Sequence, residues 1–313
     1  MKTAFIFPGQ GAQYVGMGME LYNYFNIISK IFNKTDEILK EDFVKLIFHG
    51  SDADIKKTEN TQPAVLMVST AISQLLMSEG IVPAMAAGLS LGEYSALVTA
   101  NSISYEDALP LVRKRGQLMN EAVPAGRGTM AAILGLEEDK LLLCCETASE
   151  LGTVIIANYN CPGQMVLSGD GKAVEKASQL AMEAGAKRVV PLSVSGPFHS
   201  PMLKTAGNAL ENELKQIKIK KPVIPVVQNV SAKPAVSGDE VRSMLAAQVS
   251  SPVRWEDCIR YMLSQGVDNF IEVGPGKVLS GFIKKIDKTV NIYNVEDSVS
   301  LKNVFNALKE VEQ

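Results

Sequence analysis

The pentapeptide Gly88-Leu89-Ser90-Leu91-Gly92 constrains the fold most strongly, because it lies between a short apolar segment and a segment of helical character. A G-x-S-x-G sequence in this context is typical of a nucleophile elbow, a sharp strand-to-helix turn that exposes a serine above a sheet. The glycines leave room for the turn, and the N-terminus of the next helix favours negative charge that develops near the serine. The alternative is a serine that caps a helix in an ordinary tight turn.

Strand-like and helix-like segments alternate on both sides of this pentapeptide. The first part predicts strands at residues 3–7 and 84–88 and helices around residues 21–40, 63–78, 92–100 and 104–122, the last capped by Ser104. The last part predicts strands at residues 223–227 and 269–273, a helix before Gln248 and a helix at residues 255–264. This alternation indicates an α/β fold.

The segment between residues 128 and 194 follows a different order. Its expected elements are strand, helix, strand, strand, helix and strand at residues 129–134, 137–150, 154–158, 165–168, 172–184 and 187–194. This β-α-β-β-α-β order is ferredoxin-like. Glycine and proline at residues 124–128 and 195–197 are suitable boundaries. We therefore predict a discontinuous large catalytic subdomain, residues 1–124 and 196–313, and a small ferredoxin-like subdomain inserted at residues 125–195.

Charge and composition exclude several classes of protein. The 31 Lys and Arg against 34 Asp and Glu give a net charge of −3, which supplies no basic field for duplex DNA or an anionic membrane. No apolar run reaches the roughly 20 residues of a membrane span. Cys144, Cys145, Cys161 and Cys258 have neither the spacing of a zinc site nor the number of a disulfide framework. We expect a soluble cytoplasmic protein that uses no metal and binds neither nucleic acid nor membrane.

A serine nucleophile needs a base, and histidine is the usual one near neutral pH. The chain has two histidines, His49 and His199. His49 closes an apolar stretch before Gly50, which indicates packing at a helix end. His199 lies in an irregular segment at the subdomain boundary, where clefts tend to form, and is the better candidate. Since no acidic residue is placed to orient the imidazole, a Ser-His dyad held by an amide or a main-chain carbonyl fits better than a triad.

Two further segments carry candidate site residues. The glycine-rich turn at residues 7–13 lacks the Lys-Ser/Thr ending of a P-loop. Its main-chain N–H groups could complete an oxyanion hole with the N–H of Leu91, and an ordinary tight turn is the alternative. The run Arg113-Lys114-Arg115 is by default a solvated face. An inward-facing guanidinium there would select a substrate with a free carboxylate.

These motifs together resemble the malonyl-CoA:acyl carrier protein transacylases of fatty-acid synthesis and the related acyltransferase domains of polyketide synthases. The resemblance runs along essentially the whole chain. It is carried by the sequences at residues 7–11, 61–64, 88–97, 115–119, 158–164, 196–200, 248–255 and 272–276. It implies an α/β-hydrolase-like large subdomain with an inserted ferredoxin-like small one.

The resemblance also implies a role for each matching residue. They are Ser90 as nucleophile, His199 as base, Arg115 as clamp for the malonyl carboxylate, Gln10 and Leu91 as oxyanion-hole donors, Gln248 as the residue whose main-chain carbonyl orients the histidine, and Asn160 and Phe198 as substrate-binding residues. The family usually has histidine before the nucleophile, where this chain has Leu89. Phe198 before His199 resembles the malonyl-selective pattern, since an aromatic wall leaves little room for the methyl group of methylmalonyl.

The activity implied by the resemblance is ping-pong transfer of malonyl from malonyl-CoA to the phosphopantetheine thiol of acyl carrier protein, without a cofactor. The alternatives are an acyltransferase of a polyketide or polyunsaturated fatty-acid pathway, a serine thioesterase or esterase, and a non-catalytic docking module. A buried Arg115 would argue against a simple esterase. The carrier protein is expected to be acidic, which makes Lys187-Arg188, or Lys215, Lys218, Lys220 and Lys221, candidate docking residues. The family leads us to expect a monomer.

Overall fold

The computed structural model describes residues 1–124, 126–194 and 196–311. Among these residues, five parallel strands form the larger sheet, in the spatial order β7-β2-β1-β8-β9. They are β1 (Thr3–Phe7), β2 (Met85–Gly88), β7 (Val226–Val227), β8 (Asn269–Val273) and β9 (Asn291–Val295). β1 therefore lies at the centre of the sheet, with β2 beside it, so the two segments expected to carry the site meet at neighbouring strand ends.

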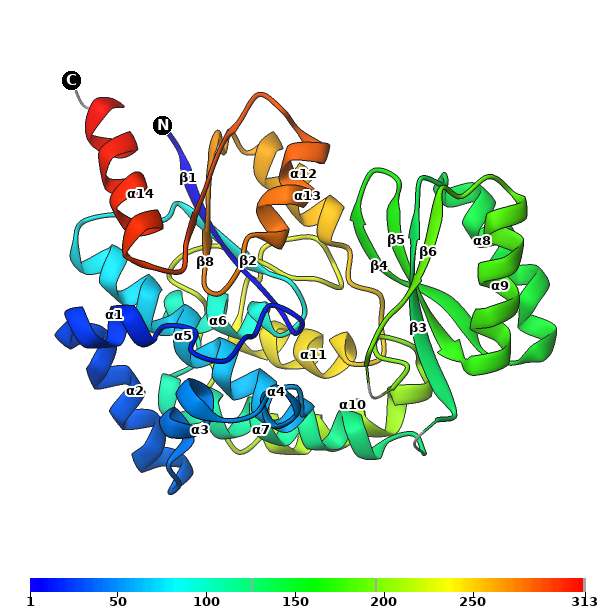
Figure 1. Cartoon of the computed structure of the whole chain (residues 1–313), viewed down its shortest axis with the longest axis horizontal. Coiled ribbons are helices and arrows are strands. Elements are labelled where there is room, and N and C mark those ends of the chain that lie inside the picture. The colour runs from blue at the N-terminus through cyan, green and yellow to red at the C-terminus, as the bar shows by residue number, and fades with distance from the viewer. Residues whose placement is uncertain (125, 195, 312–313) are drawn as a thin grey trace.

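Helices cover both faces of this sheet (Figure 1). They are α1 (Met19–Tyr24), α2 (Asn26–Leu39), α3 (Phe43–His49), α4 (Asp52–Ile55), α5 (Thr58–Ser78), α6 (Gly92–Thr99), α7 (Tyr105–Glu121), α10 (Lys204–Leu214), α11 (Gly238–Gln248), α12 (Trp255–Ser264), α13 (Val278–Ile286) and α14 (Ser298–Val311), with a short 3₁₀ helix η2 (Pro201–Leu203) before α10. Because no helix in the described part of the chain combines the length and apolar character that a bilayer crossing requires, no membrane span is found there.

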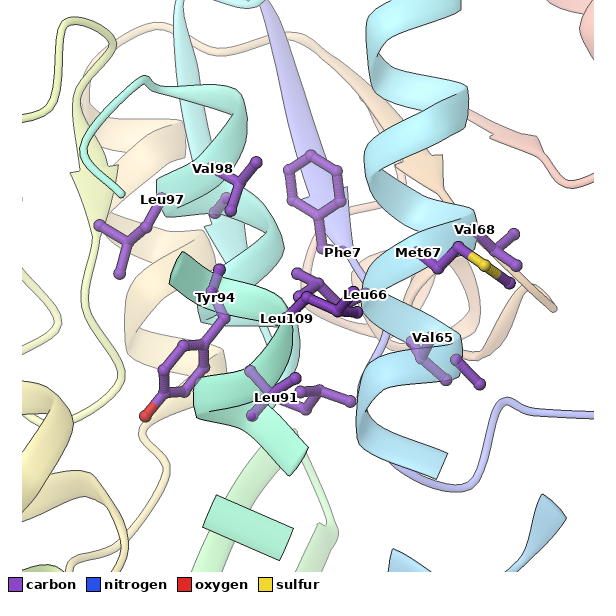
Figure 2. Close-up of a cluster of buried hydrophobic side chains, with 14 of the residues drawn as sticks. Phe7, Val65, Leu66, Met67, Val68, Leu91, Tyr94, Leu97, Val98 and Leu109 are labelled. Atoms are coloured by element: carbon purple, nitrogen blue, oxygen red, sulfur yellow. The ribbon is translucent and has the colours of Figure 1, made fainter. Parts of the chain in front are cut away.

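The side chains of β1 alternate between two hydrophobic clusters. Phe5 and Phe7 pack into the cluster that contains the apolar residues of α5, α6 and α7. Ala4 and Ile6 pack into the cluster beneath α12 and α13. Figure 2 shows Phe7 beside side chains from α5, the start of α6 and α7. A parallel sheet buried on both faces holds its strand ends rigidly, which suits a site built at those ends.

A second sheet forms the separate lobe drawn in green in Figure 1. Within the described residues it has four antiparallel strands, β3 (Gly128–Leu134), β4 (Val154–Cys161), β5 (Gln164–Asp170) and β6 (Arg188–Pro191), in the order β4-β5-β3-β6. The helices α8 (Glu138–Ala148) and α9 (Gly171–Glu183) and the 3₁₀ helix η1 (Ser149–Leu151) complete it around a hydrophobic cluster of its own. The ferredoxin-like arrangement predicted from the sequence is confirmed, while the boundary residues 125 and 195 lie outside the described residues.

Several expected elements differ from the structure in detail. The helix expected at residues 21–40 is two helices, because Phe25 adopts an extended conformation between them. The strand expected at residues 223–227 is only Val226–Val227, since Pro222 and Pro225 cannot donate to a ladder. Ser104 caps α7 as predicted, accepting a hydrogen bond from the Asp107 N–H at 3.1 Å. The helices α10, α13 and α14 and the strand β9 were not predicted.

Candidate active site

Ser90 lies in a sharp turn between β2 and α6, and its φ of 52° is in the left-handed region that is unfavourable for a residue with a side chain. The flanking glycines make the turn possible. A Cβ on Gly88 would lie 1.9 Å from the carbonyl carbon of Gly92, and a Cβ on Gly92 would lie 2.1 Å from the carbonyl oxygen of Phe7. The strand-to-helix turn predicted from the pentapeptide is therefore present, packed directly against the end of β1.

His199 faces Ser90 across the end of the sheet. The Ser90 Oγ lies 2.7 Å from His199 Nε2, and His199 Nδ1 lies 2.8 Å from the main-chain carbonyl oxygen of Gln248. A carbonyl only accepts, so Nδ1 carries the proton and Nε2 is free to accept the serine proton. The geometry is that of the expected dyad, with a main-chain carbonyl in place of an acid. His49 ends α3 as expected, and Gly50 follows it in an extended conformation.

The imidazole of His199 is neutral at neutral pH. Burial, and then the positive charge of Arg115, lower the pKa of His199 to about 4, although the hydrogen bond to Gln248 opposes this shift. Only 4% of the residue is exposed. A neutral ring can accept a proton, and the imidazolium formed by that transfer is a strong acid that returns the proton readily.

Arg115 is the inward-facing member of the basic run on α7. Its Nη2 donates to Ser90 Oγ at 3.1 Å and to Gln248 Oε1 at 2.9 Å, and its Nη1 donates to Gln62 Oε1 at 2.9 Å. The guanidinium also lies over the ring of Tyr94, 5.5 Å from its centroid. Within the part of the chain that the structure describes, no carboxylate forms an ion pair with Arg115. A buried cation held by neutral groups is well suited to bind an incoming carboxylate.

A cavity of about 220 Å³ opens beside these groups. Its walls are Gln10, Leu89, Ser90, Arg115, Met119, Met130, Asn158, Asn160, Val166, Leu192, Val194, Phe198, His199, Val278 and Phe282. Both subdomains contribute to it, since the large one brings the dyad and the small one brings residues of β3, β4 and β5 and of the segment that follows β6. The cavity is mostly apolar and has one cation and a few amides, the usual composition of a small-molecule pocket.

The remaining residues expected in the site lie around this cavity. Gln10, Asn160 and Phe198 line it, and the Oδ1 atom of Asn160 is buried without a hydrogen-bond partner among the described residues. Leu91 follows Ser90 directly and opens α6. Among the described residues, no acceptor takes a hydrogen bond from the main-chain N–H of Gln10 or Leu91.

Sequence reasoning assigned no role to three residues that contact the site. Gln62 and Glu93 stand in segments that carry the family resemblance, which was the available signal, whereas Asn229 stands in none. Asn229 binds the main chain on both sides of Leu89, and Glu93 binds Asn229 and Gln248. Burial raises the pKa of the Glu93 carboxyl to about 7. In the described residues, no group of three or more His, Cys, Asp or Glu side chains is arranged to hold a metal ion.

Comparisons with known proteins agree with this fold. The acyl transferase domain family matches residues 4–302. A malonyl CoA-acyl carrier protein transacylase of Bacillus subtilis (strain 168) is 46% identical over 310 residues, covering 99% of this chain and 98% of that protein. One of the same name from Staphylococcus aureus (strain MRSA252) is 43% identical, covering 96% of this chain and 97% of its own length.

Solved structures extend the similarity to three dimensions. The malonyl CoA-acyl carrier protein transacylase from Clostridium perfringens has a TM-score of 0.97 at 43% identity, covering 100% of this chain and 98% of that chain. A malonyl-transacylase in complex with a type II PKS acyl-carrier protein has a TM-score of 0.94 at 39% identity, covering 96% of this chain and 98% of that chain. Fold and site together define an α/β acyltransferase. The chain belongs to the acyl transferase domain family, as the resemblance in its motifs implied.

Proposed function

We propose that this acyltransferase moves the malonyl group of malonyl-CoA to the phosphopantetheine thiol of an acyl carrier protein, through a malonyl ester of Ser90, and so supplies extender units for fatty-acid biosynthesis. The names of the relatives support this substrate pair. The observation that carries the proposal is the position of Arg115 Nη2, 3.1 Å from the Ser90 Oγ that His199 also contacts.

This distance fits a short diacid. In a malonyl thioester the carboxylate is separated from the reacting carbonyl carbon by a single methylene. A cation that binds the carboxylate must therefore lie close to the nucleophile. Arg115 meets that requirement, and its planar fork allows a bidentate pair with the carboxylate. A simple esterase would have no use for this buried charge.

In the first half-reaction, the hydroxyl proton of Ser90 passes to His199 Nε2 as Oγ attacks the thioester carbonyl carbon. The main-chain N–H groups of Gln10 and Leu91 would stabilise the oxyanion. The carbon–sulfur bond then breaks, and the imidazolium returns the proton to the CoA sulfur. The Gln248 carbonyl accepts from Nδ1 throughout and holds the ring in place.

In the second half-reaction, the carrier thiol gives its proton to His199 and attacks the malonyl-serine ester. The carbon–oxygen bond breaks and Ser90 regains its proton. While Arg115 holds the malonyl group, the filled cavity leaves little room for water, which favours transfer over hydrolysis. Asn160 would contact the acyl or pantetheine chain, and Phe198 would oppose an added methyl group, a difference of about 1–3 kcal/mol.

This chemistry needs neither a metal ion nor a redox cofactor, because proton and acyl transfer are complete with the dyad and two thiols. We further propose that the protein acts as a monomer in the cytoplasm and binds neither nucleic acid nor membrane. Its four cysteines are free and buried, which suits a reducing compartment.

Intact-mass analysis tests the proposed function. The native protein should gain one malonyl group from malonyl-CoA, and Ser90→Ala should gain none. Adding a phosphopantetheinylated carrier protein should discharge the adduct onto the carrier. Rapid release of free malonate without transfer would instead identify a thioesterase, and absence of any Ser90 adduct would reject the mechanism.

A further inference from the structure

The turn that holds Ser90 is strained, and the surrounding structure must maintain it. A left-handed conformation costs a residue with a side chain about 1–2 kcal/mol. The close approaches of Gly88 and Gly92 permit the turn, but they do not fix where the Ser90 hydroxyl points. Hydrogen bonds to the main chain of the turn are needed for that. Gln248 Nε2 donates one to the Ser90 carbonyl at 3.1 Å, and a second buried side chain provides two more.

That side chain is Asn229. Its Oδ1 accepts from the Ser90 N–H at 2.7 Å, and its Nδ2 donates to the Gly88 carbonyl at 2.8 Å. Gly88 and Ser90 flank Leu89. The Asn229 carboxamide therefore binds the carbonyl of the residue before Leu89 and the N–H of the residue after it. A strand residue makes the same pair of bonds in a parallel ladder.

The position of Asn229 explains this geometry. The strands β2 and β7 pair as Ala86 with Val226 and Ala87 with Val227, and the ladder ends there. Asn229 lies two residues beyond β7. Its side chain therefore adds two hydrogen bonds to the ladder beyond the point where the main chains of β2 and β7 separate. These two bonds are made at Gly88 and at the nucleophile Ser90.

Glu93 in turn holds Asn229. The Glu93 Oε2 atom accepts from the main-chain N–H of Asn229 at 2.9 Å and from Gln248 Nε2 at 2.8 Å. Gln248 is the residue that binds both His199, through its carbonyl, and Arg115, through its Oε1. Glu93, Asn229 and Gln248 are each at most 1% exposed, so water does not compete for these bonds.

We infer that Asn229 and Glu93 are positioning residues for the proposed acyl transfer. Asn229 holds the turn that contains Ser90. Glu93 binds both Asn229 and Gln248, and Gln248 in turn binds His199 and Arg115. Neither residue lines the cavity, so neither is assigned a contact with substrate. Loss of Asn229 should lower the rate of acylation and leave substrate affinity almost unchanged, because misplacing a reacting group by about 1 Å costs about 100-fold in rate.

The experiment measures formation of the acyl-serine in single-turnover kinetics, with malonyl-CoA and with p-nitrophenyl acetate. Asn229→Ala should slow acylation by about 100-fold with both donors, with KM for malonyl-CoA changed less than threefold. Asn229→Asp keeps the acceptor for the Ser90 N–H but loses the donor to Gly88, and should slow acylation by about tenfold. Glu93→Ala should slow it too, and Glu93→Gln should restore most of the rate because its amide oxygen can accept both N–H groups.

Asn269→Ala is the matched control, because Asn269 is a fully buried amide of the same sheet that binds Thr3 Oγ1 on β1. It should keep the acylation rate of the native protein. If Asn229→Ala does not fold, Asn229→Asp decides the question. Folded Asn229→Asp with the native rate would overturn the inference. The activated ester separates this outcome from failure of the proposed function, in which the native protein would react with the ester but not with malonyl-CoA.

Discussion

Arg113 and Arg115 lie two positions apart on α7 and have opposite surroundings. Arg113 pairs with Glu41 at the surface, whereas Arg115 is buried against Ser90, Gln62 and Gln248. Arg115→Ala should lower the rate of malonyl transfer about 100-fold or more, because the malonyl carboxylate loses its cationic partner. The rate of acetyl transfer should fall only severalfold, since an acetyl group has no carboxylate. Arg113→Ala should change neither. Steady-state kinetics with malonyl-CoA and acetyl-CoA measure the difference, and equal losses for both donors would remove the clamp role.

The low pKa of His199 predicts an unusual pH profile. A group whose pKa is about 4 stays neutral, and therefore able to accept a proton, at every pH above that value. As far as the protonation of His199 sets it, the rate of Ser90 acylation should be nearly constant from pH 8 to pH 5 and fall near pH 4. An ordinary histidine with a pKa of about 6.5 would lose about thirtyfold by pH 5.

Quenched single-turnover acylation across this range measures the profile. A midpoint near pH 6.5 would contradict the low pKa. The carboxyl of Glu93, with a pKa raised by burial to about 7, can add an inflection of its own. Glu93→Gln is the control, since an inflection near pH 7 that belongs to this carboxyl should be absent from it.

At the scale of single elements, two helical glycines have opposite surroundings. Gly92 begins α6 where a Cβ would lie 2.1 Å from the Phe7 carbonyl oxygen of β1. Gly92→Ala should therefore separate α6 from the sheet and destabilise the protein by about 3 kcal/mol. Gly281 lies inside α13 with no atom within 4 Å of its would-be Cβ, and Gly281→Ala should stabilise by about 0.5–1 kcal/mol. Denaturant unfolding measures both, and a neutral Gly92→Ala would refute the close packing.

Elements with strong local signals could be predicted from the sequence, and those with weak ones could not. The strands at residues 3–7 and 269–273 and the helix at residues 255–264 are confirmed to the residue. The edge strand β9 has largely exposed or partly buried side chains, so it lacks the apolar run that marks a central strand. The break at Phe25 is invisible to periodicity, because apolar residues continue through it.

At the scale of the whole molecule, the site depends on contacts between distant segments. Ser90 and His199 could be proposed in advance because each carries a local signal, a glycine-flanked turn and a boundary segment. Asn229 could not, since it meets Ser90 only through the register of β7 against β2, 139 residues along the chain. The proposed nucleophile and base were thus easier to predict than Asn229, which binds the turn of the nucleophile.

The basic residues proposed for docking also differ in their relation to the site. Lys187 directly precedes β6 and Arg188 begins it, and the chain continues from this short strand to Leu192 in the cavity wall. Lys220 and Val223 instead bind the chain just after α6, at the opposite end of that helix from Ser90. An acidic carrier that delivers its thiol to the cavity should therefore contact the first pair.

Replacing Lys187 and Arg188 with glutamate should raise the KM for the carrier protein about fivefold to tenfold at low salt, since rim charges act mainly on association. The effect should shrink as ionic strength rises and the Debye length falls below about 8 Å. Acylation by malonyl-CoA should not change, because the dyad and Arg115 are untouched. The matched control reverses Lys218 and Lys221, with the same change in net charge. Equal effects of the two double variants would assign the attraction to overall charge, and an unchanged KM in the first would place docking on another surface.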